Sequence, residues 1–163
     1  MEFEDWARAR LPALVRFAVA LTGERGLAED VVQEVLIRAY GRWSRIAALD
    51  RPEAYLRRMV TNEYLSWRRR WAHVSSQPES GEVAEPADHA QDHAERDALT
   101  RELARLSRRA RAVLVLRYYE QLTDNEIAEV LSCPPGTVRS LASRALATLR
   151  VDTRTRDLLG EQR

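Results

Sequence analysis

The chain has 163 residues, of which 45% are apolar and 31% are charged, and its formal net charge is +1. These proportions favour one or two folded domains and exclude a wholly disordered chain. No apolar run approaches the ~20 residues that span a bilayer, and the acidic start lacks the apolar segment of a signal peptide. The single cysteine, Cys133, excludes an internal disulfide framework. We therefore expect a cytoplasmic protein without a membrane partner.

Charge divides the chain into three parts. Residues 1–72 carry 13 Arg and 10 acidic residues (net +3), residues 73–97 carry one Arg and seven (−6), and residues 98–163 carry 12 Arg and eight (+4). The middle part is rich in Pro, Ser, Gly and acid and has no aromatic residue, so it cannot bury enough apolar surface to fold. The sequence predicts an all-α protein with two small helical domains, 1–72 and 98–150, a flexible acidic linker between them, and a tail from 151 to 163.

Three helices are expected in the first domain. The first spans about residues 5–21, with a kink or break near Pro12, and Gly23 ends it. The second spans about residues 27–43. The third begins at the Asp50-Arg51-Pro52 cap and reaches about residue 71. Residues with three- and four-residue spacing are expected in the core: Leu14, Val15, Ala18, Leu21, Val31, Val35, Leu36, Ala39, Tyr55, Leu56, Met59, Val60 and Tyr64.

Four shorter helices are expected in the second domain. One spans about residues 98–106, and another follows a Ser107 cap, where the run RAVLVLRYYEQL should be buried on one side. A third follows Thr123, whose hydroxyl can form a capping box with Glu126. The last starts at Pro135, in a first turn that needs no backbone donor, and ends near residue 150.

Residues 123–150, TDNEIAEVLSCPPGTVRSLASRALATLR, are typical of a helix-turn-helix. Apolar residues stand where two short helices cross at a tight turn: Ile127, Leu131, Cys133, Val138 and Leu141. Ala128 is small where the helices approach, and Ser132 occupies the turn position at which glycine is commonest. The second helix of such a motif lies in the DNA major groove. The residues expected to face the groove are Gly136, Thr137, Arg139, Ser140, Ser143 and Arg144. The alternative is an αα-hairpin that only packs.

The segment LSRRARAVLVLRYYEQLTDNEIAEVLSCPPGTVRSLASRALATLR closely resembles the −35-binding domain of extracytoplasmic-function sigma factors, in the sigma-70 superfamily. The segment LTGERGLAEDVVQEVLIRAYGRW is similar to the part of these proteins that docks on the β′ coiled coil of RNA polymerase. The segment RPEAYLRRMVTNEYLSWRRRW is similar to their −10 element segment, and SWRRRW and ASRALATLR most resemble the SigE-like subgroup. The resemblance implies an alternative sigma factor that binds core RNA polymerase (β′ and β subunits) and promoter DNA.

The resemblance also implies site residues in the first domain. Core polymerase would be bound by residues within about one helical turn: Asp30, Gln33 and Glu34. Their acidic and amide groups suit a partner that presents arginines.

The −10 element would be bound by Asn62, Ser66, Trp67, Arg68, Arg69 and Arg70. Aromatic rings can stack on unpaired bases while arginines neutralise phosphates, and a loop at about residues 44–50 would help capture a flipped base. The alternatives are a solvated helix face and core packing of the tryptophans. Members of the family usually carry an acidic residue where this chain has Ser66, and an arginine where it has Leu141.

Other functions have weaker support in the sequence. His89 and His93 share the spacing of a metal site, but inside a Pro-containing acidic linker we interpret this as accidental and expect no metal or cofactor. There is no glycine-rich phosphate loop, nucleophile motif or HExxH, so we expect neither an enzyme nor a small-molecule substrate. An anti-sigma partner is implied by the resemblance only. The main alternative is a stand-alone dimeric helix-turn-helix transcriptional regulator, which would bind a symmetric operator tightly without polymerase.

The linker length can be compared with promoter geometry. Its 25 residues reach at most ~80–90 Å when extended and ~25–30 Å as a random coil. Promoter elements separated by a ~17-bp spacer lie ~58 Å apart at ~3.4 Å per base pair. The linker can therefore join domains bound to both elements only when it is stretched well beyond its relaxed length.

Overall fold

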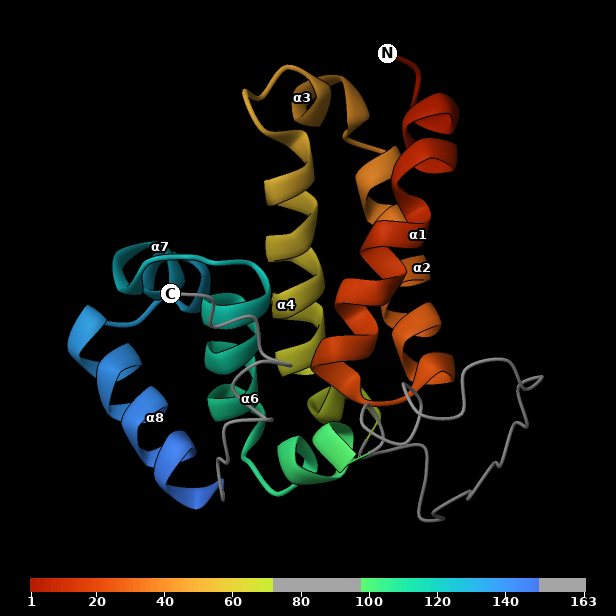
Figure 1. The fold of residues 1–163 in the computed structure, drawn as a ribbon. Helices are drawn as coiled ribbons and strands as arrows, with labels where there is room; N and C mark the ends of the chain where they lie inside the picture. The colour runs from red at the N-terminus through yellow and green to blue at the C-terminus, as the bar shows by residue number, and fades with distance from the viewer. Residues whose placement is uncertain (72–97, 150–163) are drawn as a thin grey trace.

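The computed structural model describes residues 1–71 and 98–149, and of residues 67–71 it describes the backbone alone. Every regular element in these ranges is helical, which confirms the expected all-α fold (Figure 1). The predicted linker and the predicted tail lie outside the described residues. Among the helices within these ranges, none combines the length and the apolar character that crossing a bilayer requires.

The first half of the structure, residues 1–71, is built on three long helices: α1 (Phe3–Thr22), α2 (Arg25–Tyr40) and α4 (Pro52–Trp71). Helix α1 continues through Pro12 as one helix, so a break at that residue is ruled out. It ends as predicted at Gly23, which has φ +74° and donates its N–H to the carbonyl of Val19 at 2.8 Å. Glycine suits this position because a left-handed backbone conformation costs it little.

The second helix ends earlier than predicted. Helix α2 stops before Gly41, and a separate short helix, α3 (Trp43–Ala47), occupies much of the segment expected to be a loop. The physical reason is tertiary. The Trp43 ring packs 5.2 Å from that of Trp6 and 5.3 Å from that of Phe3, and its indole N–H donates to the carbonyl of Met1. Turning the chain at this point places a large aromatic residue against α1, which burial favours.

Helix α4 confirms most of the predicted core. Leu56 and Val60 are fully buried and Tyr64 nearly so, but Tyr55 is 38% exposed, and its predicted burial is wrong. Adjacent helical residues lie about 100° apart around the axis. Once Leu56 faces α1 and α2, Tyr55 must turn away from them. Among the described residues, the largest fully buried side chain is Phe17 of α1.

The second half, residues 98–149, contains a helical segment over residues 98–104, then α6 (Arg108–Leu114), η1 (Val115–Tyr119), α7 (Asp124–Leu131) and α8 (Pro135–Thr148). The Ser107 cap is confirmed, since its hydroxyl accepts from the N–H of Ala110 at 3.2 Å. The predicted buried run is also confirmed, because residues 110–116 are all buried. Its last turn, η1, is a π-helix, which sequence reasoning did not anticipate.

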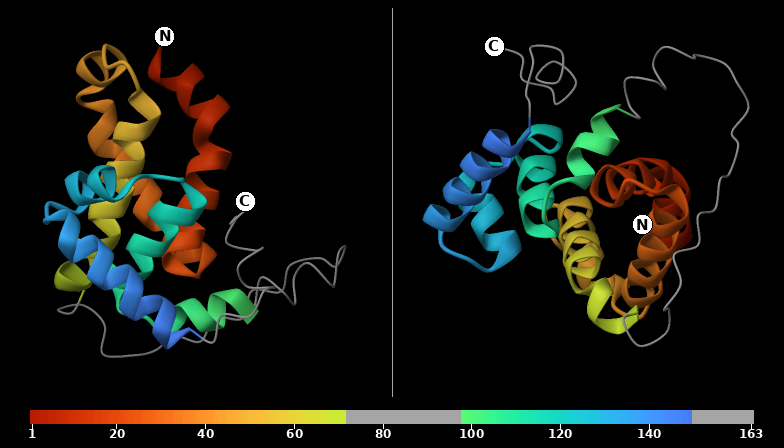
Figure 2. Two further views of the ribbon diagram at one scale, coloured as in Figure 1. Left: turned by 60° about the vertical axis from the view of Figure 1, so that its left-hand side comes forward. Right: turned by 90° about the horizontal axis from the view of Figure 1, so that it is seen from below.

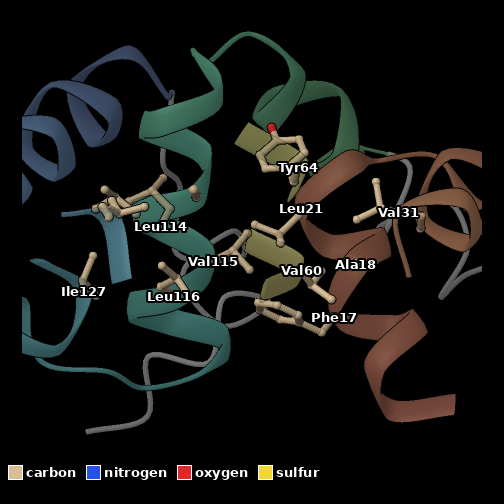
Figure 3. Packing of buried hydrophobic residues seen from close by; sticks show 14 of the residues in the cluster. Phe17, Ala18, Leu21, Val31, Val60, Tyr64, Leu114, Val115, Leu116 and Ile127 are labelled. Atoms are coloured by element: carbon tan, nitrogen blue, oxygen red, sulfur yellow. The ribbon is translucent and has the colours of Figure 1, made fainter. Parts of the chain in front are cut away.

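The two halves pack against each other through one cluster of buried apolar side chains (Figure 3). Helix α4 contacts both α6 and α7, and α8 packs on α6 and α7. Figure 2 accordingly shows α6, α7 and α8 gathered on one side of α4, with α1 and α2 on the other. Val115 of η1 lies on the side that faces Leu21 of α1 and Val60 of α4 (Figure 3). Burial of each such side chain stabilises the arrangement by about 1.5–3 kcal/mol.

Candidate nucleic-acid interface

The helix-turn-helix of α7 and α8 begins with a capping box. The Thr123 hydroxyl accepts from the N–H of Glu126 at 3.2 Å, and the Glu126 carboxylate accepts from the N–H of Thr123 at 2.8 Å. The backbone N–H of Thr123, and after it the Thr123 side-chain hydroxyl, lower the pKa of the Glu126 carboxyl group below its ordinary value of 4.5. The start of α7 is thus fixed by two reciprocal hydrogen bonds, as predicted.

The conformation of the turn between α7 and α8 explains why glycine is commonest in such motifs at the position that Ser132 occupies here. Ser132 has φ 52° and ψ 50°, a left-handed conformation that costs a residue with a Cβ about 1–2 kcal/mol. The next N–H, that of Cys133, donates to the carbonyl of Ala128 at 3.0 Å and closes the turn. Cys133 and Leu141 are half-buried, not fully buried, whereas Ala128 is buried at the close approach as predicted.

Helix α8 turns one face to the protein and the other to solvent. Val138, Ala142 and Ala145 are buried on the inner face. The outer face carries most of the predicted groove-facing residues in exposed positions: Gly136, Arg139, Ser140, Ser143 and Arg144. Thr137 is half-buried. The Arg144 side chain donates to the carbonyl of Ser140 at 3.3 Å, and a Cβ added at Gly136 would lie 3.8 Å from the Arg139 guanidinium. The face is therefore accessible, basic and rich in small polar groups.

A second accessible surface lies on α2, which we call the docking face: Asp30, Gln33 and Glu34. All three are exposed, on the side of α2 opposite its buried valines. The same stripe continues with Ile37 and Tyr40, which are 63% and 62% exposed. Sequence reasoning missed these two residues, although their positions off the Val31–Val35–Ala39 stripe were a usable signal. The stripe combines acidic groups with apolar area, a combination typical of protein interfaces.

The predicted −10 residues lie in the last turns of α4. Asn62 is exposed, and Ser66 is half-buried and donates its hydroxyl to the carbonyl of Glu63 at 3.2 Å. Glu63 itself is buried and forms an ion pair with Arg38 of α2. This pair connects α4 to the helix that carries the docking face. The other four predicted residues belong to α4 by their backbone, but their side chains lie outside the described residues: Trp67, Arg68, Arg69 and Arg70.

The junction between the halves contains two titratable groups with shifted pKa values. Arg111 of α6 is buried and donates from Nε and Nη2 to the carbonyl of Ala20, both at 3.2 Å. Burial lowers the pKa of Arg111, and the neighbouring Tyr64 phenol, once ionised, acts in the opposite direction. Burial likewise raises the pKa of Tyr64, while Arg111 and then Arg108 act to lower it.

The fold and the exposed face of α8 define a helical protein of the helix-turn-helix class that acts on DNA. Two family models match the chain: Sigma-70 region 2 over residues 6–73, and Sigma-70, region 4, over residues 96–149. The chain belongs to the sigma-70 family of RNA polymerase sigma factors. The region 2 model matches in addition to the model for the helix-turn-helix region. A sigma factor is therefore favoured over a stand-alone dimeric regulator.

Relatives from several bacteria agree with this assignment. The chain is 39% identical over 158 residues to the RNA polymerase sigma-E factor of Streptomyces avermitilis, covering 97% of this chain and 88% of that protein. It is 37% identical over 145 residues to the ECF RNA polymerase sigma factor SigL of Mycobacterium tuberculosis, covering 85% of this chain and 81% of that protein. Among solved structures, it resembles the sigma factor RpoE of Bartonella quintana in complex with the anti-sigma factor NepR, with TM-score 0.67 and 25% identity over 99% and 98% of the chains.

These matches define the general activity. The chain is an alternative sigma factor, which binds core RNA polymerase and promoter DNA and directs promoter recognition and transcription initiation. Sigma factors are not enzymes, and the catalytic step of transcription belongs to the polymerase.

Proposed function

We propose that this sigma factor recognises the −35 element with the outer face of α8. The observation that carries the proposal is that Val138, Ala142 and Ala145 anchor α8, so that its arginine and serine side chains are left for DNA. A guanidinium can bind guanine O6 and N7 as a two-pronged donor, or a phosphate as a cation. Arg139, near the N-terminus of α8, is in the part of a recognition helix that reads bases.

The docking face on α2 is proposed as the polymerase-binding surface. Asp30, Gln33 and Glu34 supply negative charge and hydrogen-bonding groups for a basic partner, and Ile37 and Tyr40 add apolar area beside them. Such a surface gains specificity from its charges and affinity from its buried apolar centre. All five residues lie on one helix, α2, which sets the spacing of their side chains.

The end of α4 is proposed as the −10 surface. Asn62 is exposed and can reach a base edge, and the segment from Trp67 to Arg70 follows it in the same helix. Glu63 and Arg38 fix this part of α4 against α2. Flipping a base out of the DNA stack costs a few kcal/mol of free energy. Stacking and hydrogen bonds between that base and this surface must offset the cost. Because Ser66 stands where members of the family usually carry an acidic residue, the base preference of this surface should differ from theirs.

Run-off transcription with purified core RNA polymerase tests the function directly. We expect the chain to direct initiation at specific start sites only when core enzyme is present, and to bind isolated promoter DNA weakly. Tight binding to a symmetric operator by a dimer without polymerase would instead support the stand-alone regulator. Because sigma factors act on RNA polymerase in the cell, we place this chain in the cytoplasm. The solved complex of RpoE with NepR supports an anti-sigma partner for this chain as well.

A further inference from the structure

One ion pair joins α2 to α4 beside the proposed −10 residues. Only 3% of the Glu63 side chain is exposed, and its carboxylate pairs with the guanidinium of Arg38, whose side chain is 39% exposed. The two residues are 25 positions apart in the chain. Asn62 directly precedes Glu63, and the Ser66 hydroxyl donates to the Glu63 carbonyl. The pair therefore lies next to two residues that we propose to bind the −10 element.

The Arg38 guanidinium is held at two points. Its Nε donates to the carbonyl of Glu34, one turn earlier in α2, at 3.4 Å and lies 3.9 Å from the Glu34 carboxylate. Its Nη2 meets the Glu63 carboxylate. Because a guanidinium is planar and its N–H groups have fixed directions, the contact at Nε limits where Nη2 can point. Arg38 thus presents a donor to α4 at a position that α2 defines.

This ion pair differs in kind from the apolar contacts of α4. Leu56 and Val60 are fully buried where α4 packs on α1 and α2. Apolar burial is non-directional, so it stabilises the packing without defining the exact rotation of a helix. A charge-assisted hydrogen bond is directional, and a buried carboxylate that loses its cation is costly. The Arg38–Glu63 pair can therefore fix the rotation of α4 about its axis at this point.

The rotation of α4 decides which side chains reach DNA. Successive helical residues are about 100° apart, and residues one turn apart share a side of the helix. With Glu63 turned to Arg38, Asn62 and Ser66 share another side of α4, and Asn62 is exposed there. A hydrogen bond to a base edge requires a separation of about 2.7–3.2 Å, so a displacement of about 1 Å is enough to lose it. Base reading by Asn62 therefore depends on how α4 is held.

We propose that Arg38 is a positioning residue for the −10 surface, which acts through Glu63 to orient α4 at Asn62 and thereby determines base preference at the −10 element. The proposal rests on the −10 surface proposed above. It assigns part of the base discrimination to a side chain of α2, a different helix from the one that meets the base.

Base discrimination by the holoenzyme tests the proposal. Each variant of the full chain is assembled with purified core RNA polymerase. Its affinity is measured for forked promoter DNA that is double-stranded upstream and single-stranded across the −10 element of a mapped promoter. Probes with one −10 base changed at a time give a ratio of cognate to altered affinity at each position. Because one holoenzyme binds all the probes, a change in polymerase affinity cancels in this ratio.

Asn62→Ala first identifies the base that Asn62 reads. One base contact is worth about 5- to 150-fold in discrimination, so we expect Arg38→Gln to lower the ratio at that same base about fivefold or more. Arg38→Lys keeps the charge but cannot hold both contacts, and it should restore part of the ratio. An equal loss of affinity for every probe would instead indicate a general effect of Arg38 and overturn the positioning role.

A double variant separates positioning from stability. In Arg38→Met with Glu63→Leu, apolar side chains replace the ion pair, and such replacements often maintain or raise stability. We expect this chain to be folded, by circular dichroism and urea denaturation, and its discrimination at the Asn62 base to stay low. Wild-type discrimination in this variant would show that packing alone orients α4 and would overturn the proposal. Arg8→Gln removes the same charge from an exposed ion pair on α1 and should change neither property.

The outcomes also distinguish this inference from the proposed function. If Asn62→Ala changes the ratio at no −10 base, the proposed −10 surface is wrong and the positioning role fails with it. If Asn62→Ala lowers the ratio at one base while Arg38→Gln leaves it unchanged, the −10 surface stands and only the positioning role is wrong.

Discussion

Arg139→Ala is the sharpest test of the proposed DNA-binding role of the outer face of α8. Arg139 is exposed on α8, beside the buried Val138–Ala142–Ala145 stripe and outside it. Its truncation should therefore change the free energy of unfolding by no more than about 0.5 kcal/mol. If its guanidinium binds a guanine in the −35 element, its loss should cost about 1–3 kcal/mol of binding. That energy corresponds to about a 5- to 150-fold weaker complex.

The assay is holoenzyme binding to a promoter duplex found by mapping transcription start sites after overexpression. It is measured by fluorescence anisotropy at several salt concentrations. A base contact predicts reduced affinity for the cognate −35 sequence and relaxed specificity at one base pair. A phosphate contact predicts equal weakening on all sequences and a salt dependence reduced by about one ion. Arg8→Ala, in an exposed position on α1, is the matched control and should change neither. Unchanged −35 affinity in Arg139→Ala, or an equal loss of core polymerase binding, would refute the assignment of this face.

Three further predictions concern the docking face, the turn and the cap. Asp30→Arg combined with Glu34→Arg should abolish co-purification with core polymerase while helix content by circular dichroism stays unchanged; intact assembly would show that α2 is not the docking helix. Ser132→Gly should raise the free energy of unfolding by about 1 kcal/mol, measured by urea denaturation, because glycine adopts φ 52° with little strain; a loss of stability would contradict this account of the turn. The pKa of Glu126 is lowered in the folded state by the N–H of Thr123, so the cap stabilises fully above the ordinary value of 4.5 and is lost as the pH falls through the folded-state pKa. Glu126→Gln should remove this part of the acid dependence of Tm, and an acid transition identical in both proteins would show that the cap does not contribute.

Local chemistry was readable from the sequence. The ends of the helices follow from residues that act within one turn: Ser107 and Thr123 as caps, Gly23 as a left-handed terminus, and Pro135 as a first-turn residue. The outward face of α8 follows from helical periodicity alone. The family resemblance, carried by the same short segments, pointed to the function.

Only the tertiary structure decided features that depend on distant parts of the chain. The early end of α2 requires the contact of Trp43 with α1, and the exposure of Tyr55 requires knowing which side of α4 the core occupies. The role of Arg111 in joining the halves is invisible in sequence, because an arginine in an amphipathic helix has the same pattern whether it meets water or another domain. Periodicity and caps report interactions within a few residues, whereas packing between halves depends on the shape of both surfaces at once.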